Sequence, residues 1–154
     1  MRRTRFDDAP CPIARATDLV GDWWTPIVMR EAFAGARRFD DFVERLDVPR
    51  ATLTARLDRL VDEGLLRRVR YQERPERFEY RLTEQGFAFY DVLAAMWRWG
   101  QDWRWSDGEQ PPLELVDRDS GRPVVPVVVD ETTGERIDVR RLAVRRRGCN
   151  SPEA

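Results

Sequence analysis

Apolar residues recur every three or four positions over residues 12–63, which is the spacing of one face of an α-helix. Prolines and glycines divide this pattern, because proline suits the first turn of a helix and glycine the position after its end. The third segment is typical, with Phe39, Phe42, Val43 and Leu46 at i, i+3, i+4 and i+7. Four helices are predicted: Pro12 to Gly21, Thr25 to Gly35, 38–46, and Pro49 to Gly64.

The fourth helix has a polar face as well as an apolar one. Leu53, Leu57, Leu60 and Val61 form its apolar stripe. The remaining surface is polar, and in an isolated helix such a face is usually solvated. Short side chains there also let the backbone approach another surface closely. The polar residues concerned are Thr52, Thr54, Arg56 and Arg59.

The periodicity changes to two over residues 65–83, and this predicts two β-strands. Phe78, Tyr80 and Leu82 are expected to point to one face of the second strand. The stretch QERPER, with Pro75 in it, predicts a turn between the strands. The segment is therefore a predicted β-hairpin. The opposite face of its second strand carries Arg77, Glu79 and Arg81.

A longer helix is predicted from Thr83, a suitable N-cap, to Trp103. It has two apolar stripes, whereas a surface helix of a monomer normally needs only one. The second stripe is expected to face another subunit, so the sequence predicts a homodimer. The first stripe is Phe87, Tyr90, Leu93, Ala94 and Trp97, and the second is Phe89, Val92, Met96, Trp99 and Trp103.

The composition changes after Trp105. Residues 106–112 are predicted to be a linker. Residues 113–145 hold two similar units 13 residues apart, each with a β-branched run and a turn that ends in glycine. Two such units predict a small three-stranded β-meander. Residues 146–154 are expected to be a flexible tail.

The order of the elements is more specific than any one of them. The third and fourth helices predict a helix-turn-helix, and the hairpin after them predicts a wing. The expected fold class is mainly α with a β-hairpin wing, a winged helix-turn-helix over residues 1–105, plus the small C-terminal β-meander. The fourth helix would enter the major groove of DNA, and the wing would reach the adjacent backbone. The predicted DNA-binding residues are Arg50, Thr52, Thr54, Arg56 and Arg59 of the helix, and Arg74 and Arg77 of the wing.

Charge and composition favour nucleic-acid binding over catalysis. The net charge is −1, yet residues 45–81 hold ten arginines against seven acidic residues, while residues 106–154 hold eight against ten. All 27 basic residues are arginine, which biased codon usage explains most simply. Arginine is nevertheless a better bidentate ligand than lysine for phosphate and guanine. Histidine is absent, and no metal cluster, phosphate loop or nucleophile motif is found. We therefore predict no enzyme activity, no cofactor and no metal site.

Two features of the sequence bear on where in the cell the protein is located. No run approaches the roughly 18 apolar residues of a membrane helix. The N-terminus has no apolar region typical of a signal peptide. The sequence therefore predicts a cytoplasmic protein without a membrane partner.

Four stretches resemble the HxlR-type winged-helix transcription regulators, which are related to the MarR group. They are CPIARATDLVGDWWT, RRFDDF, RATLTARLDRLVDEGLL and RYQERPERFEYRLTEQG, within residues 11–100. The resemblance implies homodimers that are built through the terminal helices and bind palindromic double-stranded operator DNA near promoters. We take repressor as the leading expectation for its function. The alternative from another class is a winged-helix module that binds proteins, which the arginines of the fourth helix oppose.

The two C-terminal units resemble the zinc-ribbon modules that some relatives carry at this place. Ser120, Asp130 and Thr133 stand where the resemblance would put metal-binding cysteines. A structural zinc site needs four Cys or His ligands. The segment is therefore predicted to be a metal-free remnant that retains its glycine turns.

Cys11 is a candidate redox sensor. It precedes Pro12 at the start of the first helix, a position that favours thiol reactivity. The family resemblance implies that some relatives sense oxidants or electrophiles through a cysteine there. The other interpretation is a structural residue near the dimer interface, and the flanking prolines and Ile13 predict partial burial.

The tryptophans indicate a second way to sense an effector. All six lie in the second and last helices or directly beside them. Aromatic residues with few polar groups suit a pocket for a small apolar or aromatic effector. Core packing and the dimer interface are the alternative, because aromatic stripes are usually core. The residues assigned to the pocket or interface are Trp24, Trp97, Trp99 and Trp103.

Overall fold

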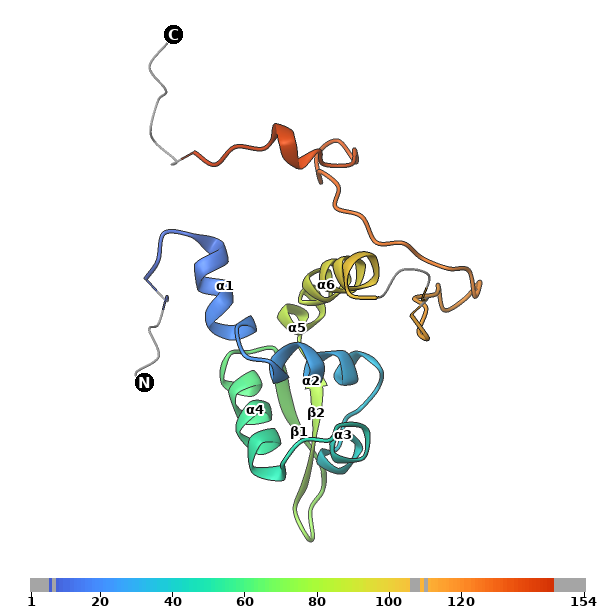
Figure 1. Cartoon of the computed structure of the whole chain (residues 1–154). Helices are drawn as coiled ribbons and strands as arrows, with labels where there is room; N and C mark the ends of the chain where they lie inside the picture. Colours follow the sequence, from blue (N-terminus) through green and yellow to red (C-terminus); the bar gives the residue numbers. More distant parts are fainter. Residues whose placement is uncertain (1–5, 7, 106–108, 110, 146–154) are drawn as a thin grey trace. The chain divides into compact units, whose positions relative to one another are not determined.

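The computed structural model describes residues 6, 8–105, 109 and 111–145 of the chain. These residues form two compact units that divide after Ala94. The first unit contains the predicted helix-turn-helix and wing (Figure 1). The second contains most of the last helix and the C-terminal appendage. The predicted tail and four residues of the predicted linker, 106–108 and 110, lie outside the described residues.

The elements of the first unit follow the predicted order (Figure 1). Helix α2 is central in this unit, since it contacts α1, α3, α4 and β2. The elements are α1 (Pro12–Val20), α2 (Trp24–Phe33), α3 (Phe39–Arg45), α4 (Arg50–Asp62), β1 (Leu66–Gln72), β2 (Arg77–Leu82), α5 (Glu84–Ala88) and the start of α6 (Tyr90–Trp103).

The apolar stripe of α4 is buried, as predicted. Leu53, Leu57 and Leu60 are fully buried, and Val61 is partly buried against the same core. That core includes Phe42 of α3 and Met29 of α2. Full burial of one leucine side chain contributes roughly 1.5–3 kcal/mol. The stripe therefore determines which side of α4 faces the core and which side is left for another molecule.

Helix α2 begins at Trp24, earlier than predicted, and Thr25 is not its cap. The carboxylate of Asp22 accepts hydrogen bonds from the backbone amides of Trp24 and Thr25, at 2.9 and 3.0 Å. Thr25 is buried, and its hydroxyl donates to the same carboxylate at 2.6 Å. A carboxylate satisfies several free amides at a helix start at once, so Asp22 takes over the capping role.

Strands β1 and β2 form the predicted antiparallel hairpin, with Leu66 opposite Leu82. The loop before α3 joins this sheet, because the backbone amide of Tyr80 donates to the carbonyl of Arg37 at 2.6 Å. The hairpin is thereby attached directly to the start of α3. This attachment sets where the wing lies relative to the helix-turn-helix.

Glu79 departs from the predicted alternation along β2. Its neighbour Tyr80 is buried as predicted, but Glu79 is buried as well. The guanidinium of Arg81 donates to Glu79 Oε1 at 2.5 Å. A carboxylate tolerates burial when it is paired in this way. The pairing depends on the conformation of two side chains, which a period of two does not reveal.

The predicted helix from Thr83 to Trp103 is two helices. Thr83 caps α5 as predicted, and its hydroxyl accepts a hydrogen bond from the Gly86 amide at 3.0 Å. The helix is interrupted at Phe89, between α5 and α6. Phe89 is buried in the core of the first unit. It was assigned to the stripe that faces another subunit, and that assignment is wrong for this residue.

The C-terminal appendage of the second unit is simpler than the predicted three-stranded meander. It has two turns, each ending in a glycine of positive φ, Gly121 at 68° and Gly134 at 71°. Each turn is closed by one bridge. The valines between the turns are exposed, so no apolar face is buried to stabilise a longer ladder. The bridges join Val116 to Pro123 and Val129 to Arg136, and a short 3-10 helix, η1 (Val139–Arg141), follows.

Among the described residues, no helix has both the length and the apolar character that crossing a membrane requires.

Candidate nucleic-acid interface

The first two turns of α4 form an exposed surface of small and polar residues. Pro49 stands before the first helical residue, Arg50, and the Thr54 hydroxyl donates to the Arg50 carbonyl at 3.0 Å. Thr52 is half-buried, while Thr54 is exposed. Residues with short side chains leave room for another molecule to approach the helix backbone. The exposed residues here are Arg50, Ala51, Thr54 and Ala55.

Arg50 connects α4 to α3. Its guanidinium lies 3.1 Å from Asp40 and 5.0 Å from the centre of the Phe39 ring. Both charged side chains of the ion pair are well exposed. An exposed pair of this kind contributes little stability, about 0–1 kcal/mol. Arg50 can therefore exchange Asp40 for a phosphate or a base edge at small cost.

Arg56 and Arg59, two of the predicted DNA-binding residues, contact other parts of the protein. The guanidinium of Arg56 lies 3.4 Å from the carboxylate of Asp22. Arg59 donates to the backbone carbonyl of Asp18 and lies 3.9 Å from Glu63. Both arginines thus point to the end of α1 and the start of α2. A helical wheel gives their angle around α4 but does not show which neighbouring helix occupies that side.

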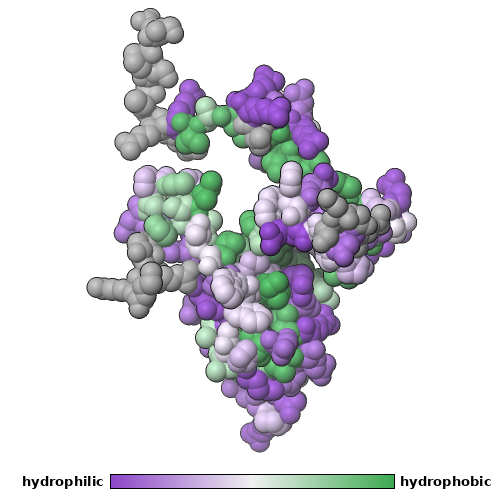
Figure 2. Space-filling view, viewed as in Figure 1, coloured by the Kyte–Doolittle hydropathy of each residue, from purple (hydrophilic) through white to green (hydrophobic). Residues whose placement is uncertain are grey.

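The wing presents the two arginines that were assigned to it. Arg74 and Arg77 are exposed near the tip, which is hydrophilic in the surface view, at the lower end of the molecule (Figure 2). Arg70 of β1 behaves differently, since it pairs with Glu73 and Glu76 at 3.9 and 3.2 Å. Arg74 and Arg77 are the wing cations best placed for a phosphate backbone.

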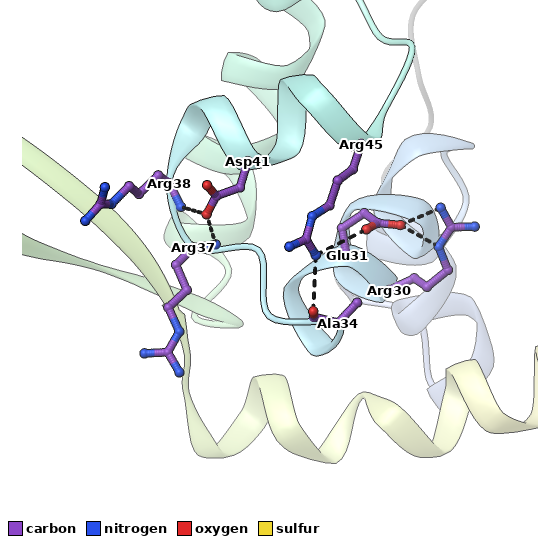
Figure 3. Close-up of polar contacts among 7 residues, drawn as sticks. All are labelled: Arg30, Glu31, Ala34, Arg37, Arg38, Asp41 and Arg45. Carbon is purple, nitrogen blue, oxygen red and sulfur yellow. Dashed lines mark hydrogen bonds and ion pairs between the residues drawn. The ribbon is translucent and has the colours of Figure 1, made fainter. Parts of the chain in front are cut away.

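Two further arginines at the start of α3, Arg37 and Arg38, are exposed but were not among the DNA-binding residues predicted from the sequence. The backbone amides of Arg37 and Arg38 donate to Asp41 at 2.9 and 2.8 Å, and both side chains point away from that carboxylate (Figure 3). These bonds, that of Arg38 first, lower the pKa of Asp41. The Arg38 guanidinium lies 4.5 Å from the centre of the Tyr71 ring in β1. The motif RRFDD, residues 37–41, could have indicated this arrangement, because its two arginines precede the aspartate that caps α3.

The end of α3 is fixed to α2 by a buried carboxylate. Glu31 of α2 is buried and accepts hydrogen bonds from Arg30, at 2.6 and 2.9 Å (Figure 3). Arg45 at the end of α3 lies 3.8 Å from Glu31 and donates to the Ala34 carbonyl at 3.1 Å. These contacts hold the two helices in one orientation, so α3 can present α4 in a defined position.

This arrangement of helices and wing has known relatives. Residues 19–107 match the family of HxlR-like helix-turn-helix proteins. The chain belongs to the HxlR family. An HTH-type transcriptional regulator of Mycobacterium tuberculosis, Rv3095, is 39% identical over 130 residues, which are 84% of this chain and 82% of Rv3095. The chain is therefore a transcriptional regulator with a helix-turn-helix DNA-binding domain.

Solved structures of transcriptional regulators resemble the chain as well. The crystal structure of PA1607, a proposed transcription factor, has a TM-score of 0.83 and 36% identity, and the match covers 93% of this chain and 99% of PA1607. The redox regulator HypR in its reduced form has a TM-score of 0.57 and 28% identity, over 61% of this chain and 94% of HypR. The match to PA1607 extends over the appendage as well as the winged helix.

The candidate sensor Cys11 is exposed, so the expected partial burial is wrong for this chain. It occupies the N-cap position of α1 without a side-chain capping bond. None of the residues of helix α1 is buried against the described part of the first unit. A reactive thiol needs both thiolate character and exposure to solvent, and Cys11 meets the second requirement.

The tryptophans assigned to one pocket do not share one environment. Trp24 is half-buried and packs against the core of the first unit. Trp97 lines a cleft of about 280 Å³ in the second unit. Trp99 and Trp103 are exposed. The residues that line the cleft are Met96, Trp97, Gly100, Gln101, Trp105, Pro111, Pro112 and Leu113.

Proposed function

We propose that this HxlR-family regulator is a cytoplasmic, homodimeric repressor that binds palindromic operator DNA through α4 and the wing. The main support for this proposal is the exposed surface of the first turns of α4, which combines small residues with Arg50 and Thr54. A recognition helix contacts base edges with its N-terminal residues. Arg74 and Arg77 on the wing, and Arg37 and Arg38 before α3, would hold the phosphate backbone on either side.

Dimer formation is supported by apolar side chains that the chain leaves uncovered. Ile13 of α1 is 77% exposed, and Trp99 and Trp103 of α6 are 59% and 71% exposed. Neither α1 nor α6 contains a buried residue. Large apolar side chains gathered on a surface are characteristic of interfaces between proteins. In a symmetric dimer on DNA, the two α4 helices would read half-sites about one helical turn apart, ~10 bp centre to centre.

Selection of bound sites from random DNA tests the proposal, followed by affinity measurements with variants. We expect a two-fold symmetric site, and weaker binding by about 1–3 kcal/mol for Arg50→Ala. Arg74→Ala should weaken binding to all sequences evenly and reduce the salt dependence. Arg118→Ala removes the same charge from an exposed turn of the appendage and serves as the control. Equal effects of all three variants, or a monomer in light scattering, would contradict the proposal.

Redox sensing through Cys11 is the second candidate function. The exposure of Cys11 at the start of α1 favours it, and one structural relative, HypR, is a redox regulator. The step would be oxidation of the thiolate by an external oxidant such as a peroxide. The product is a sulfenic acid that can condense with a second thiol. The reaction would change the surface of α1 that we assign to the dimer.

A small apolar or aromatic effector remains a proposal for the cleft of the second unit. Its lining is almost entirely apolar, and Trp97 and Trp105 contribute aromatic side chains to it. An apolar aromatic ring would suit this lining. Titration with planar aromatic compounds, followed by tryptophan fluorescence and DNA affinity, tests this assignment. Trp97→Ala, which removes an aromatic ring from the lining, should bind the compound more weakly.

A further inference from the structure

Two arginines of α4 connect the recognition helix to the end of α1 and the start of α2. Arg56 reaches the carboxylate of Asp22, and Arg59 reaches the carbonyl of Asp18. Arg56 lies 34 residues from Asp22 along the chain, and Arg59 lies 41 residues from Asp18. The contacts are therefore tertiary. They act on the half of α4 that follows the exposed reading surface.

Asp22 joins two helices through one carboxylate. Its oxygens accept hydrogen bonds from the Trp24 amide and from the amide and hydroxyl of Thr25, and they also face Arg56. Burial by itself raises the pKa of Asp22, but these hydrogen bonds and the charge of Arg56 together hold that pKa below its ordinary value. The carboxylate is thus ionised at neutral pH, and the start of α2 and the middle of α4 share one anion.

We propose that Asp22 is a positioning residue for DNA binding, which acts through Arg56 to hold α4 in the orientation that reads DNA. This inference rests on the proposed function, because it requires α4 to be the recognition helix. Arg59 supports the same orientation through the end of α1. Neither Asp22 nor Arg56 touches DNA in this proposal.

Burial distinguishes this role from direct DNA contact. The side chain of Arg56 is 27% exposed and that of Asp22 is 10% exposed. Within the described part of the chain, the buried Nε atom of Arg56 has no hydrogen-bond partner. Arg56 is thus far less exposed than Arg50, which is 66% exposed, and its Nη1 atom already faces Asp22. Arg50, by contrast, forms its ion pair with Asp40 between two well exposed side chains, so it can turn toward DNA at small cost.

The exposed residues beside these arginines point to the same conclusion. Asp58 and Asp62 are exposed on the second half of α4, and Glu63 is exposed directly after its end. Their carboxylates would repel a phosphate backbone. DNA contact is therefore confined to the first turns of α4, and the second half of the helix serves to fix its position.

Asp22→Asn provides the first test, because asparagine keeps an oxygen that can cap α2 but removes the charge that faces Arg56. Loss of a negative charge would by itself strengthen binding to DNA. We expect the opposite, a loss of affinity of roughly 3- to 10-fold for the selected site. Asp62→Asn makes the same charge change at the exposed end of α4, and it should leave affinity unchanged or slightly higher. Unchanged or tighter binding by Asp22→Asn would overturn the proposal.

Arg56→Gln provides the second test, with salt dependence as its readout. A residue that positions the helix leaves the salt slope unchanged, whereas loss of a phosphate contact lowers the slope by about 1. We expect Arg56→Gln to lower affinity at an unchanged slope, and Arg56→Lys to restore part of the loss. The double variant with Asp22→Asn should bind about as well as Arg56→Gln alone, because both changes remove one contact. A reduced slope for Arg56→Gln, with additive losses, would show direct contact and overturn the proposal.

The same measurements separate failure of this inference from failure of the proposed function. Arg74→Ala should reduce the salt slope whether or not Asp22 positions α4. If the wild type selects no DNA site, both proposals fail. If Arg74→Ala behaves as expected while Asp22→Asn binds like the wild type, only the positioning role fails. Thermal melting of each variant, with binding measured well below the midpoint, ensures that only folded protein is compared.

Discussion

Gly86 lies directly against the backbone carbonyl of Leu65, so closely that a Cβ atom on residue 86 would overlap the carbonyl oxygen. The contact joins the first turn of α5 to the beginning of the hairpin. Thr83 stabilises the same junction. Its amide donates to the Leu65 carbonyl at 3.1 Å, and its hydroxyl donates to the Gly64 carbonyl at 2.6 Å. The point where the wing ends and the last helices begin is thereby fixed to the end of α4.

Gly86→Ala should therefore destabilise the protein by about 1–3 kcal/mol, because backbone must move to make room for a methyl group. Gly100→Ala in α6 is the matched control. Apart from the backbone of α6 itself, no atom of the described residues lies within 4 Å of a Cβ at that position, and alanine is a better helix former by roughly 1 kcal/mol. Urea unfolding followed by tryptophan fluorescence measures both. Similar unfolding midpoints for the two variants would show that the close contact between Gly86 and the Leu65 carbonyl does not affect stability.

The Asp41 carboxylate should contribute stability only above acidic pH. Its pKa in the folded state lies below the ordinary value of 3.8, because the Arg38 and Arg37 amides bind the ionised form. The contribution is fully present above pH 3.8 and is lost as pH falls through the lowered pKa. Since Asp41 is largely accessible to solvent, we expect less than about 1 kcal/mol.

Thermal melting of wild type and Asp41→Asn between pH 2 and 7 checks this prediction. The difference in stability should be constant at neutral pH and should shrink below about pH 4, because the protonated carboxyl resembles asparagine in charge. A difference that grows as the solution is acidified would contradict the assignment of the cap.

Cys11 should be modified by a thiol reagent in the native protein. Its side chain is exposed, and reactivity requires access. A Cys149→Ser background removes the other thiol, which lies outside the described residues. Mass spectrometry after treatment with iodoacetamide, with and without denaturant, gives the result. Labelling only in denaturant would show that another subunit covers Cys11.

The functional consequence of that exposure needs a separate measurement. If Cys11 is the sensor, a mild oxidant should lower the affinity of wild type for the selected DNA, and Cys11→Ser should bind DNA without responding. An identical response in Cys11→Ser would leave the aromatic effector as the better proposal.

The appendage should hold no zinc, because Ser120, Asp130 and Thr133 stand where a zinc-ribbon module would carry cysteines. In the structure these residues form hydrogen bonds within the two turns. Asp117 Oδ1 accepts from the amide and hydroxyl of Ser120 at 2.8 and 2.6 Å. Asp130 Oδ1 accepts from the amides of Thr132 and Thr133 at 2.8 and 3.1 Å. We expect elemental analysis of the purified protein to find no stoichiometric zinc, and a chelator to leave its melting midpoint unchanged. One equivalent of zinc per chain would refute the prediction.

Much of the fold could be predicted from local patterns. The stripe of Leu53, Leu57 and Leu60 is buried as its spacing indicates, since a period of 3.6 places these residues on one face. Thr83 caps α5 because its hydroxyl needs only residues two or three positions away. The glycines of positive φ at residues 121 and 134 form the turns that the 13-residue repeat predicted. Each of these features depends on residues close together in the chain.

What the sequence by itself determined is the set of helices, the hairpin, and the helix-turn-helix family to which they belong. Only the tertiary structure decided which arginines of α4 remain accessible, because Arg56 and Arg59 are occupied by Asp22 and Asp18 from a segment more than 30 residues earlier. The burial of Glu79 was decided in the same way, by the position of the Arg81 guanidinium. A pattern of residue types defines the faces of one element, whereas the neighbour that covers each face is set by the packing of several elements at once.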